Sequence, residues 1–306
     1  MKKLALWALV CAAGITASSQ TSVSNSNNTL LWRISGKNLT KPSYLFGTIH
    51  LLCANDIEIS VTLKTAIKET DKVYLELDMD NLFEMMQAVQ KMKMRNDTTL
   101  SDLLSEKDYQ KVKAFFSSRS SLIPFSILET YKPMLAASMI MQASTDCENA
   151  ISMEQLIMQQ AKHEGKEIKG METMAYQLSI FDSIPYELQA KQLVAFIDDD
   201  NKEEKAGKEY DEMALAYRNQ ELSKLEALIT REEFGVGNFT DLLLYNRNYN
   251  WVASMQKIFN LNSVVVAVGA GHLPGEKGVI NLLRKAGYTV EPMENKMVKT
   301  NKQLQL

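Results

Sequence analysis

Two histidines of this chain occupy matching contexts, each three residues after a glycine that ends an apolar run. His50 closes the segment GTIH at 47–50, and His272 closes the segment GAGH at 269–272. The whole chain contains only three histidines, so the coincidence of two contexts is informative. In α/β sheets, sites form outside the carboxyl ends of the strands. The two segments therefore predict two imidazoles that converge on one site, with glycines that let the backbone pass close to a ligand.

A carboxylate follows a third apolar run, at Glu76 in the segment VYLELD (73–78). A buried carboxylate is costly unless it pairs with a cation or binds one. Together with His50 and His272, Glu76 would complete a set of two histidines and one carboxylate, which suits zinc, manganese or iron. The alternative is that Glu76 lies beside Asp78 on the solvent face of a half-exposed strand.

The segment at 269–275 (GAGHLPG) also resembles the start of a dinucleotide-binding fingerprint, which requires Gly-x-Gly-x-x-Gly. Its third glycine position is Pro274, and Gly275 comes one residue late. The segment lies near the end of the chain, whereas the fingerprint normally opens a βαβ unit. A phosphate-binding loop is therefore not favoured.

The elements that must position these residues lie at both ends of the chain. Helices are expected between them, through most of 81–259, and also at 61–69 and 278–286. Short apolar or β-branched runs predict strands at 30–34, 44–49, 73–77, 264–268 and 288–292. This order predicts an α/β (mixed α+β) fold, with a central mixed sheet formed by the N- and C-terminal strands and a large helical insertion at about 81–260. We expect one domain over 30–295, a disordered leader at 20–29 and a polar tail at 296–306.

The composition is that of an ordinary globular protein, with 45% hydrophobic and 23% charged residues. Thirteen glycines and six prolines in 306 residues are too few for a turn-dense all-β fold. The formal net charge is −3, so no basic excess points to nucleic acid, and no nucleic-acid partner is expected.

The first 19 residues have the layout of a secretory signal peptide. Lys2 and Lys3 precede an apolar run at 4–15, which is shorter than the roughly 20 residues of a spanning helix, so no integral membrane span is expected. A lipid anchor at Cys11 is not favoured, because Val10 is bulky for the position before a lipidated cysteine. The mature protein is expected to be extracytoplasmic, either periplasmic or secreted.

Two cysteines remain after removal of this leader, Cys53 and Cys147. Export favours a disulfide between them, because disulfides persist in oxidising compartments. The alternative is a pair of reduced, buried thiols.

Several segments together resemble the TraB/GumN family, which includes the Tiki-type metalloproteases. The resemblance runs from about residue 30 to 293 and is carried by FGTIHL (46–51), LELD (75–78), GMET (170–173), Arg247-Asn248 with Trp251, and GAGHLPG (269–275). It implies a metal-dependent hydrolase on a mixed α/β fold.

The resemblance also implies roles for particular residues. His50 and His272 would be central to a metal site, with Glu76 as a ligand or base. Glu172 would be a second functional carboxylate, and Gln177 follows at the spacing that the family shows. Arg247 and Asn248 match the Arg-Asn pair of the family.

The chemistry of such a set can be argued from the residue types. A divalent metal ion (manganese, cobalt or zinc) would polarise a carbonyl and lower the pKa of a bound water. Glu172 would take the proton from that water. Arg247 would stabilise an oxyanion or hold a substrate carboxylate, unless it forms only a surface ion pair. Trp251, four residues further on the same helix face, is expected to pack in the core.

Three functions remain open from the sequence. The leading one is a secreted or periplasmic metal-dependent hydrolase, a peptidase by preference, acting on a peptide or small-molecule substrate. The second is a non-catalytic module that binds a peptide or small ligand in the same cleft. The third is an erythromycin-esterase-like hydrolase that acts on an ester.

Overall fold

The computed structural model describes residues 28–54, 57–118, 123–143, 149–198, 202–230 and 239–297. The predicted signal peptide (1–19), most of the predicted leader, Cys147 and most of the predicted tail lie outside the described residues. Among the described residues, none of the helices combines the length and apolar character that a membrane crossing requires.

A six-stranded mixed sheet forms the centre of the fold, which confirms the predicted class. Its order is β6-β4-β7-β2-β1-β8. Neighbours among β6, β4, β7 and β2 are parallel, whereas β1 is antiparallel to both β2 and β8. The strands are β1 (Leu31–Ser35), β2 (Ser43–Thr48), β4 (Lys72–Leu75), β6 (Glu167–Gly170), β7 (Val264–Gly269) and β8 (Thr289–Pro292). The four parallel strands therefore end at one edge of the sheet.

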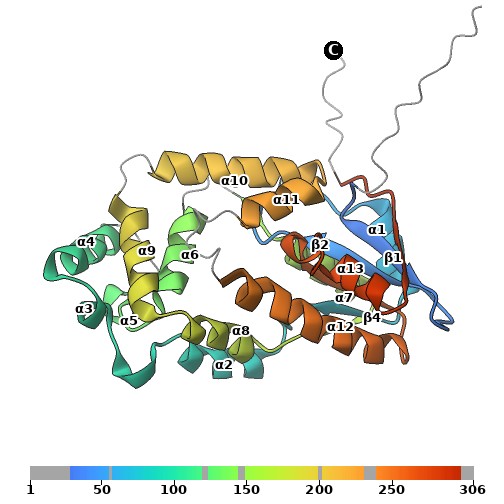
Figure 1. The fold of residues 1–306 in the computed structure, drawn as a ribbon, viewed down its shortest axis with the longest axis horizontal. Helices are drawn as coiled ribbons and strands as arrows, with labels where there is room; N and C mark the ends of the chain where they lie inside the picture. The colour runs from blue at the N-terminus through green and yellow to red at the C-terminus, as the bar shows by residue number, and fades with distance from the viewer. Residues whose placement is uncertain are drawn as a thin grey trace, which may run out of the picture.

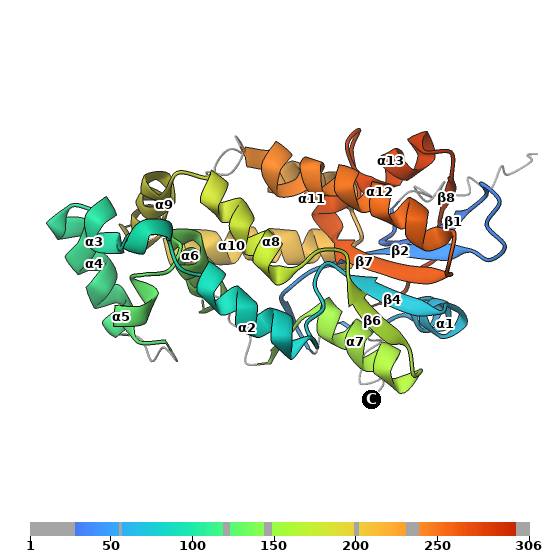
Figure 2. The same cartoon turned by 90° about the horizontal axis from the view of Figure 1, so that it is seen from below.

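Helices cover both faces of this sheet (Figure 2). Helices α1 (Val61–Glu69) and α7 (Met153–His163) lie on one face, and α12 (Asn246–Phe259) and α13 (Val279–Lys285) lie on the other. The residues of the central strand from Val264 to Val268 are fully buried, as the unbroken β-branched run predicts for a strand covered on both sides.

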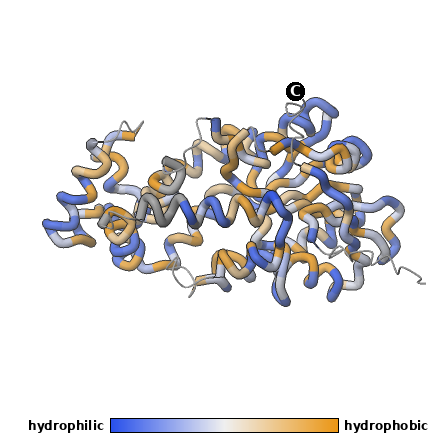
Figure 3. Tube along the Cα trace, turned by 90° about the horizontal axis from the view of Figure 1, so that it is seen from above, coloured by the Kyte–Doolittle hydropathy of each residue, from blue (hydrophilic) through white to orange (hydrophobic). Residues whose placement is uncertain are grey.

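The rest of the chain forms a helical half beside the sheet (Figure 1). A separate cluster of buried residues holds it together, including Val112, Phe116, Leu128 and Leu193. Apolar segments run through both halves (Figure 3). The helices of this half are α3 (Leu100–Leu103), α4 (Glu106–Ser117), α5 (Phe125–Leu128), α6 (Pro133–Ala143) and α9 (Tyr186–Asp198).

Four further helices connect this half to the sheet. They are α2 (Leu82–Lys91), α8 (Met174–Ile180), α10 (Lys202–Arg218) and α11 (Leu222–Ile229). Short turns of other helix types are η1 (Arg95–Asp97), η2 (Phe181–Ser183), the π-helical η5 (Asp241–Tyr245) and η6 (Ala270–His272).

Local sequence signals set several helix boundaries. The side chain of Ser152 accepts a hydrogen bond from the amide of Gln155, whose side chain accepts one from the amide of Ser152, so a capping box opens α7. The Ser105 hydroxyl caps α4 by accepting a hydrogen bond from the amide of Asp108. The helix expected at 61–69 is α1, which has the same bounds.

Most predicted elements agree with the structure to within one or two residues, and two differences matter for the site. The predicted helical stretch at 81–259 contains a strand, β6, which pairs on one side only and carries two charged residues among four. Such a short, polar edge strand lacks the apolar run on which strand prediction depends. The strand expected at 73–77 ends at Leu75, so Glu76 lies just beyond it.

A small two-stranded sheet joins β3 (Leu52–Cys53) to β5 (Ala150–Ile151). Cys53 lies opposite Ala150, three residues after position 147. Because Cys147 lies outside the described residues, its disulfide with Cys53 stays a prediction.

Candidate functional site

The predicted site residues follow the ends of the four parallel strands. His50 comes two residues after β2, Glu76 directly after β4, Glu172 two residues after β6, and His272 at the end of η6, which continues β7. The topology therefore brings together segments that lie far apart in the sequence, and His50, Glu76 and His272 line a common cavity.

Arg247, in the first turn of α12, connects these segments. Its Nη2 donates to Glu76 Oε2 at 2.6 Å, and its Nε donates to Glu172 Oε1 at 2.9 Å. A second bond runs from Nη2 to the same oxygen of Glu172. Nη1 lies 3.3 Å from His272 Nε2 and donates to the Leu243 carbonyl at 3.0 Å. The guanidinium is 7% exposed and is therefore a buried cation shared by two carboxylates and an imidazole.

Glu76 is fixed as an ionised, hydrogen-bonded carboxylate. Its Oε1 accepts from the backbone amide of Gly269 at 2.7 Å, and its Oε2 accepts from Gln177 at 3.1 Å as well as from Arg247. Burial raises the pKa of this carboxyl, but the charges of His272, Arg247 and His50 and the Gly269 bond outweigh burial and hold the pKa at about 2.

Glu172 lies behind Arg247 and is not among the residues that line the cavity. Its side chain is 7% exposed, and its Oε2 accepts from the indole of Trp251 at 3.1 Å. Burial raises the pKa of Glu172, and the Arg247 guanidinium opposes that increase. The arrangement makes Glu172 an anchor for Arg247.

His272 is held in one tautomer by Asn248. The amide nitrogen of Asn248 donates to the carbonyls of His272 and Lys277, so its oxygen faces His272 Nδ1 at 2.7 Å and accepts the ring proton. Nε2 therefore carries the lone pair that faces Arg247. Burial lowers the pKa of His272 to about 4, so the ring is neutral at pH 7.

Trp251 is buried, as expected, yet it also contacts the site. Its ring lies 4.5 Å from the His272 ring and 4.6 Å from the Arg247 guanidinium, in addition to the bond to Glu172. The predicted shared helix face of Arg247 and Trp251 is confirmed, and it lets Trp251 cover the charged cluster with an apolar surface.

His50 has a different partner from the other site residues. Its Nδ1 lies 2.9 Å from Glu154 Oε1, and its side chain is 73% exposed. The bond to Glu154 raises the pKa of His50 to about 9, against the opposing effect of burial of part of the ring. Glu154, near the start of α7, was not predicted. The sequence around Glu154 indicates only the start of a helix, because its partner His50 lies about a hundred residues away in the sequence.

Two adjoining cavities occupy the carboxyl edge of the sheet, with His50, Glu76 and Gln177 shared between their walls. One is about 240 Å³ and is lined by Arg247, His272 and apolar residues of α10, α11 and η5. The other is about 500 Å³ and extends toward α7, where Met79 and Met158 contribute apolar lining.

The resemblance implies a metal ion held by His50, Glu76 and His272. Within the described ranges, no three His, Cys, Asp or Glu side chains are placed to hold a metal ion. Arg247 accounts for this, because its guanidinium bonds Glu76 and faces the lone pair of His272. The predicted set of His50, Glu76 and His272 shares a cavity but does not fit a metal ion in this arrangement.

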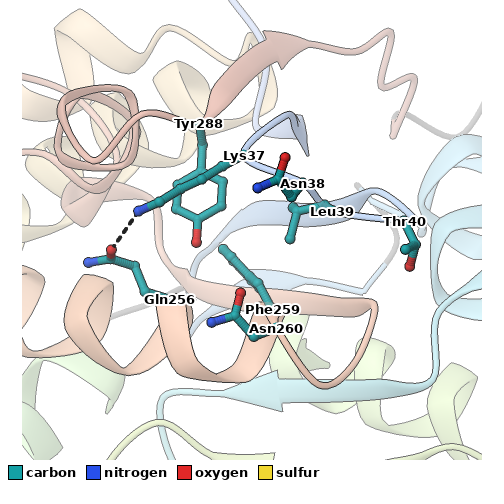
Figure 4. Close-up of a pocket in the computed structure, with 8 residues that line it drawn as sticks. All are labelled: Lys37, Asn38, Leu39, Thr40, Gln256, Phe259, Asn260 and Tyr288. Carbon is teal, nitrogen blue, oxygen red and sulfur yellow. Dashed lines mark hydrogen bonds between the residues drawn. The ribbon is translucent and has the colours of Figure 1, made fainter.

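A further hollow of about 320 Å³ lies at the opposite end of the sheet, by the β1–β2 turn (Figure 4). There Lys37 donates to Gln256 at 3.0 Å, and its ammonium lies 5.0 Å from the Tyr288 ring centre. None of the predicted site residues lines this hollow, so it plays no part in the site.

Comparison with known proteins gives one finding. A family model described as the TraB/PrgY/gumN family matches residues 30–292. Neither a curated protein nor a solved structure matches the chain.

Proposed function

Because this chain belongs to the TraB/PrgY/gumN family, we propose that it is a hydrolase whose carboxyl-edge cleft cleaves a peptide or another carboxylic acyl bond. The observation that carries the proposal is the convergence of both Gly-x-x-His segments on a cavity backed by a buried arginine. An exposed imidazole beside a buried cation offers a proton donor and an anion-stabilising group on one cavity wall.

His50 supplies the proton in this proposal. At neutral pH its raised pKa keeps the ring protonated, with Nδ1 bonded to Glu154, so Nε2 is the atom that donates to a substrate. Water adds to the carbonyl carbon, and the bond to the leaving nitrogen or oxygen breaks as that atom takes the His50 proton. The proton lost by the attacking water restores His50, so the net reaction consumes one water.

Arg247 supplies positive charge to the same step. Arg247 lines the smaller cavity, and its N–H groups are already engaged by Glu76, Glu172, Leu243 and His272. It would therefore stabilise charge developing on the carbonyl oxygen through its electrostatic field. Glu76, Glu172 and Gln177 hold the guanidinium and one another in place, and Asn248 orients His272 against it. Such preorganised groups cost no rearrangement at the moment of reaction.

Metal dependence is a separate question. A divalent ion bound at this site would polarise the carbonyl and acidify a water. Because His50, Glu76 and His272 are not placed to hold an ion among the described residues, the proposed steps rely on the side chains alone. Elemental analysis of the purified mature protein, beside its His50→Ala and His272→Ala variants, measures whether manganese, cobalt or zinc is held.

The function is tested with a panel of peptides and esters. Each is assayed with manganese, cobalt and zinc in turn and with a chelator. We expect turnover of at least one substrate and a decrease of roughly 10²–10⁴-fold in Glu172→Gln, which loosens Arg247. Binding without turnover across the panel would contradict the hydrolase and favour the binding module, and cleavage of esters alone would favour the erythromycin-esterase-like reaction.

We also propose that the protein acts outside the cytoplasm and carries a Cys53–Cys147 disulfide. The pairing of β3 with β5 supports the disulfide, because it places Cys53 against the segment that follows Cys147. Mass spectrometry of the exported protein should find cleavage near residue 19 and the two cysteines linked. Two freely alkylatable thiols would contradict the pairing.

A further inference from the structure

We propose that Glu154 is a positioning residue of the cleft, whose carboxylate holds the His50 ring with Nδ1 protonated and turns Nε2 toward the substrate. The role of Nε2 rests on the proposed function, whereas the pair itself does not. Neither the sequence motifs nor the family match assigns a role to Glu154.

The two side chains of the His50–Glu154 contact differ in their exposure to solvent. His50 Nδ1 and Glu154 Oε1 are 2.9 Å apart, with the Glu154 side chain 13% exposed and the His50 side chain 73% exposed. The contact is an ion pair, because neither oxygen of Glu154 has a partner of regular hydrogen-bond geometry among the described residues. The Thr48 hydroxyl and the backbone amide of Glu154 itself are further polar neighbours of the carboxylate, and against the effect of burial they and His50 lower its pKa. The carboxylate is thus buried in the cleft wall with His50 as its main partner.

Burial of this carboxylate needs an explanation. A buried carboxylate without a cation costs several kcal/mol or more. Glu154 is the second residue of α7, where the helix N-terminus favours negative charge by about 1 kcal/mol. That gain is smaller than the cost, and the Thr48 hydroxyl and the Glu154 amide add only neutral partners, so the imidazolium of His50 is the charged group that stabilises the buried carboxylate.

Backbone hydrogen bonds hold the two partners together. The amide of Met153 donates to the Ile49 carbonyl at 3.1 Å, so the neighbours of Glu154 and His50 are bonded directly. The β3–β5 pairing continues this ladder, with Leu52 opposite Ile151. The geometry of the pair is therefore set by the fold and does not depend on two flexible side chains alone.

His50 connects the His50–Glu154 pair to both cavities of the cleft. The ring lines both cavities of the cleft, while its Nδ1 faces Glu154. Only one tautomer of a neutral imidazole can donate from Nδ1, and in that tautomer Nε2 carries the lone pair. Glu154 therefore decides which nitrogen meets the substrate, whether His50 gives or accepts a proton there.

The same helix offers a matched control. His163 and Glu164 approach within 3.4 Å at the end of α7, where His163 is 80% exposed and lines no cavity of the cleft. The Glu164→Gln variant removes the same charge from a His–Glu contact on the same element without touching the site.

The pair is tested first by NMR of histidine rings. The chain has three histidines, so selective ¹⁵N-histidine labelling gives three ring systems, assigned by replacing His50, His163 and His272 one at a time. We expect a fixed, hydrogen-bonded Nδ1–H for His50 in the native protein. This signature should be lost in Glu154→Gln, weakened in Glu154→Asp and unchanged in Glu164→Gln. A His50 spectrum that Glu154→Gln does not alter would overturn the proposal.

Steady-state kinetics then tests the consequence for turnover. With a cleaved substrate, Glu154→Gln should lower kcat by roughly 10–10²-fold and leave KM within about twofold, with partial rescue in Glu154→Asp. An unchanged kcat in Glu154→Gln, or an equal loss of kcat in Glu164→Gln, would overturn the positioning role of Glu154. Absence of turnover in the native protein would instead refute the proposed function, and the NMR result on the pair would stand independently.

Discussion

At the scale of single residues, the site depends on one buried cation. Arg247 is bonded to Glu76 and Glu172 and faces His272, and these carboxylates come from segments 171 and 75 residues away in the sequence. Removal of one partner from a buried ion pair is more damaging than removal of the whole group, because the remaining charge keeps its desolvation cost.

The replacement Arg247→Met should therefore lower the free energy of unfolding by about 3–5 kcal/mol, because two carboxylates lose their buried counterion. Denaturant unfolding followed by circular dichroism measures the change. The combined variant Arg247→Met, Glu76→Gln, Glu172→Gln should recover most of the loss, since no charge is left unpaired. A combined variant as unstable as the single one would show that the cost comes from packing.

His272 predicts how stability depends on pH. Burial lowers its pKa to about 4, below the ordinary 6.5 of the unfolded chain. Between these values the unfolded state binds more protons, so stability is complete above pH 6.5 and falls as the pH decreases through 4. In His272→Asn the unfolding free energy should change less between pH 6.5 and 4.5 than in the native protein, by on the order of 2 kcal/mol.

The control for this measurement is His163→Asn, which alters an exposed histidine outside the site. Its stability should follow the native pH dependence. If the His272 variant follows the native curve as well, the ring does not stay neutral in the folded protein.

At the scale of elements, the site exists because parallel strands end together. The order β6-β4-β7-β2 aligns the segments that carry Glu172, Glu76, His272 and His50. Gly170, at the end of β6, permits this close approach. A Cβ there would lie 2.7 Å from the Glu172 carbonyl oxygen and 2.9 Å from the Asp78 amide nitrogen, both of them backbone atoms.

Gly170→Ala should therefore destabilise the protein by about 1–3 kcal/mol, because backbone atoms must move apart to admit the methyl group. Thermal unfolding measures the effect. Lys169→Ala, at the half-exposed neighbouring position, is the control and should stay close to the native protein. Equal stability of the two variants would mean that the strand ends are not packed as described.

The sequence predicted the elements whose signals are local. The buried run of β7 and the glycines before both histidines could be identified directly, and the two histidines line one cavity. The edge strand β6 was missed because two of its four residues are charged and it pairs on one side only, so it has no apolar run. Glu154 was missed because its contact with His50 depends on the pairing of residues 49–54 with residues 149–153. No local sequence pattern encodes this pairing.

At the scale of the whole molecule, the helical insertion takes part in the site. Helix α10 crosses above the first histidine segment, where the Tyr217 hydroxyl donates to the Gly47 carbonyl at 2.8 Å and Tyr210 donates to the Leu51 carbonyl at 3.0 Å. Tyr217 and Met213 of this helix line the smaller cavity with apolar residues of α11 and η5. The sheet thus carries the reactive groups, and the insertion shapes the space that a substrate must fit.

If the cleft hydrolyses its substrate through His50, loss of this ring must abolish most of the turnover. The measurement is kcat/KM for a cleaved substrate in three proteins: the native chain, His50→Ala and His163→Ala. His50 lines the cleft and His163 does not, so loss of the His50 ring should lower kcat/KM by at least about 10²-fold, whereas His163→Ala should match the native value. Native-like turnover in His50→Ala would contradict the account.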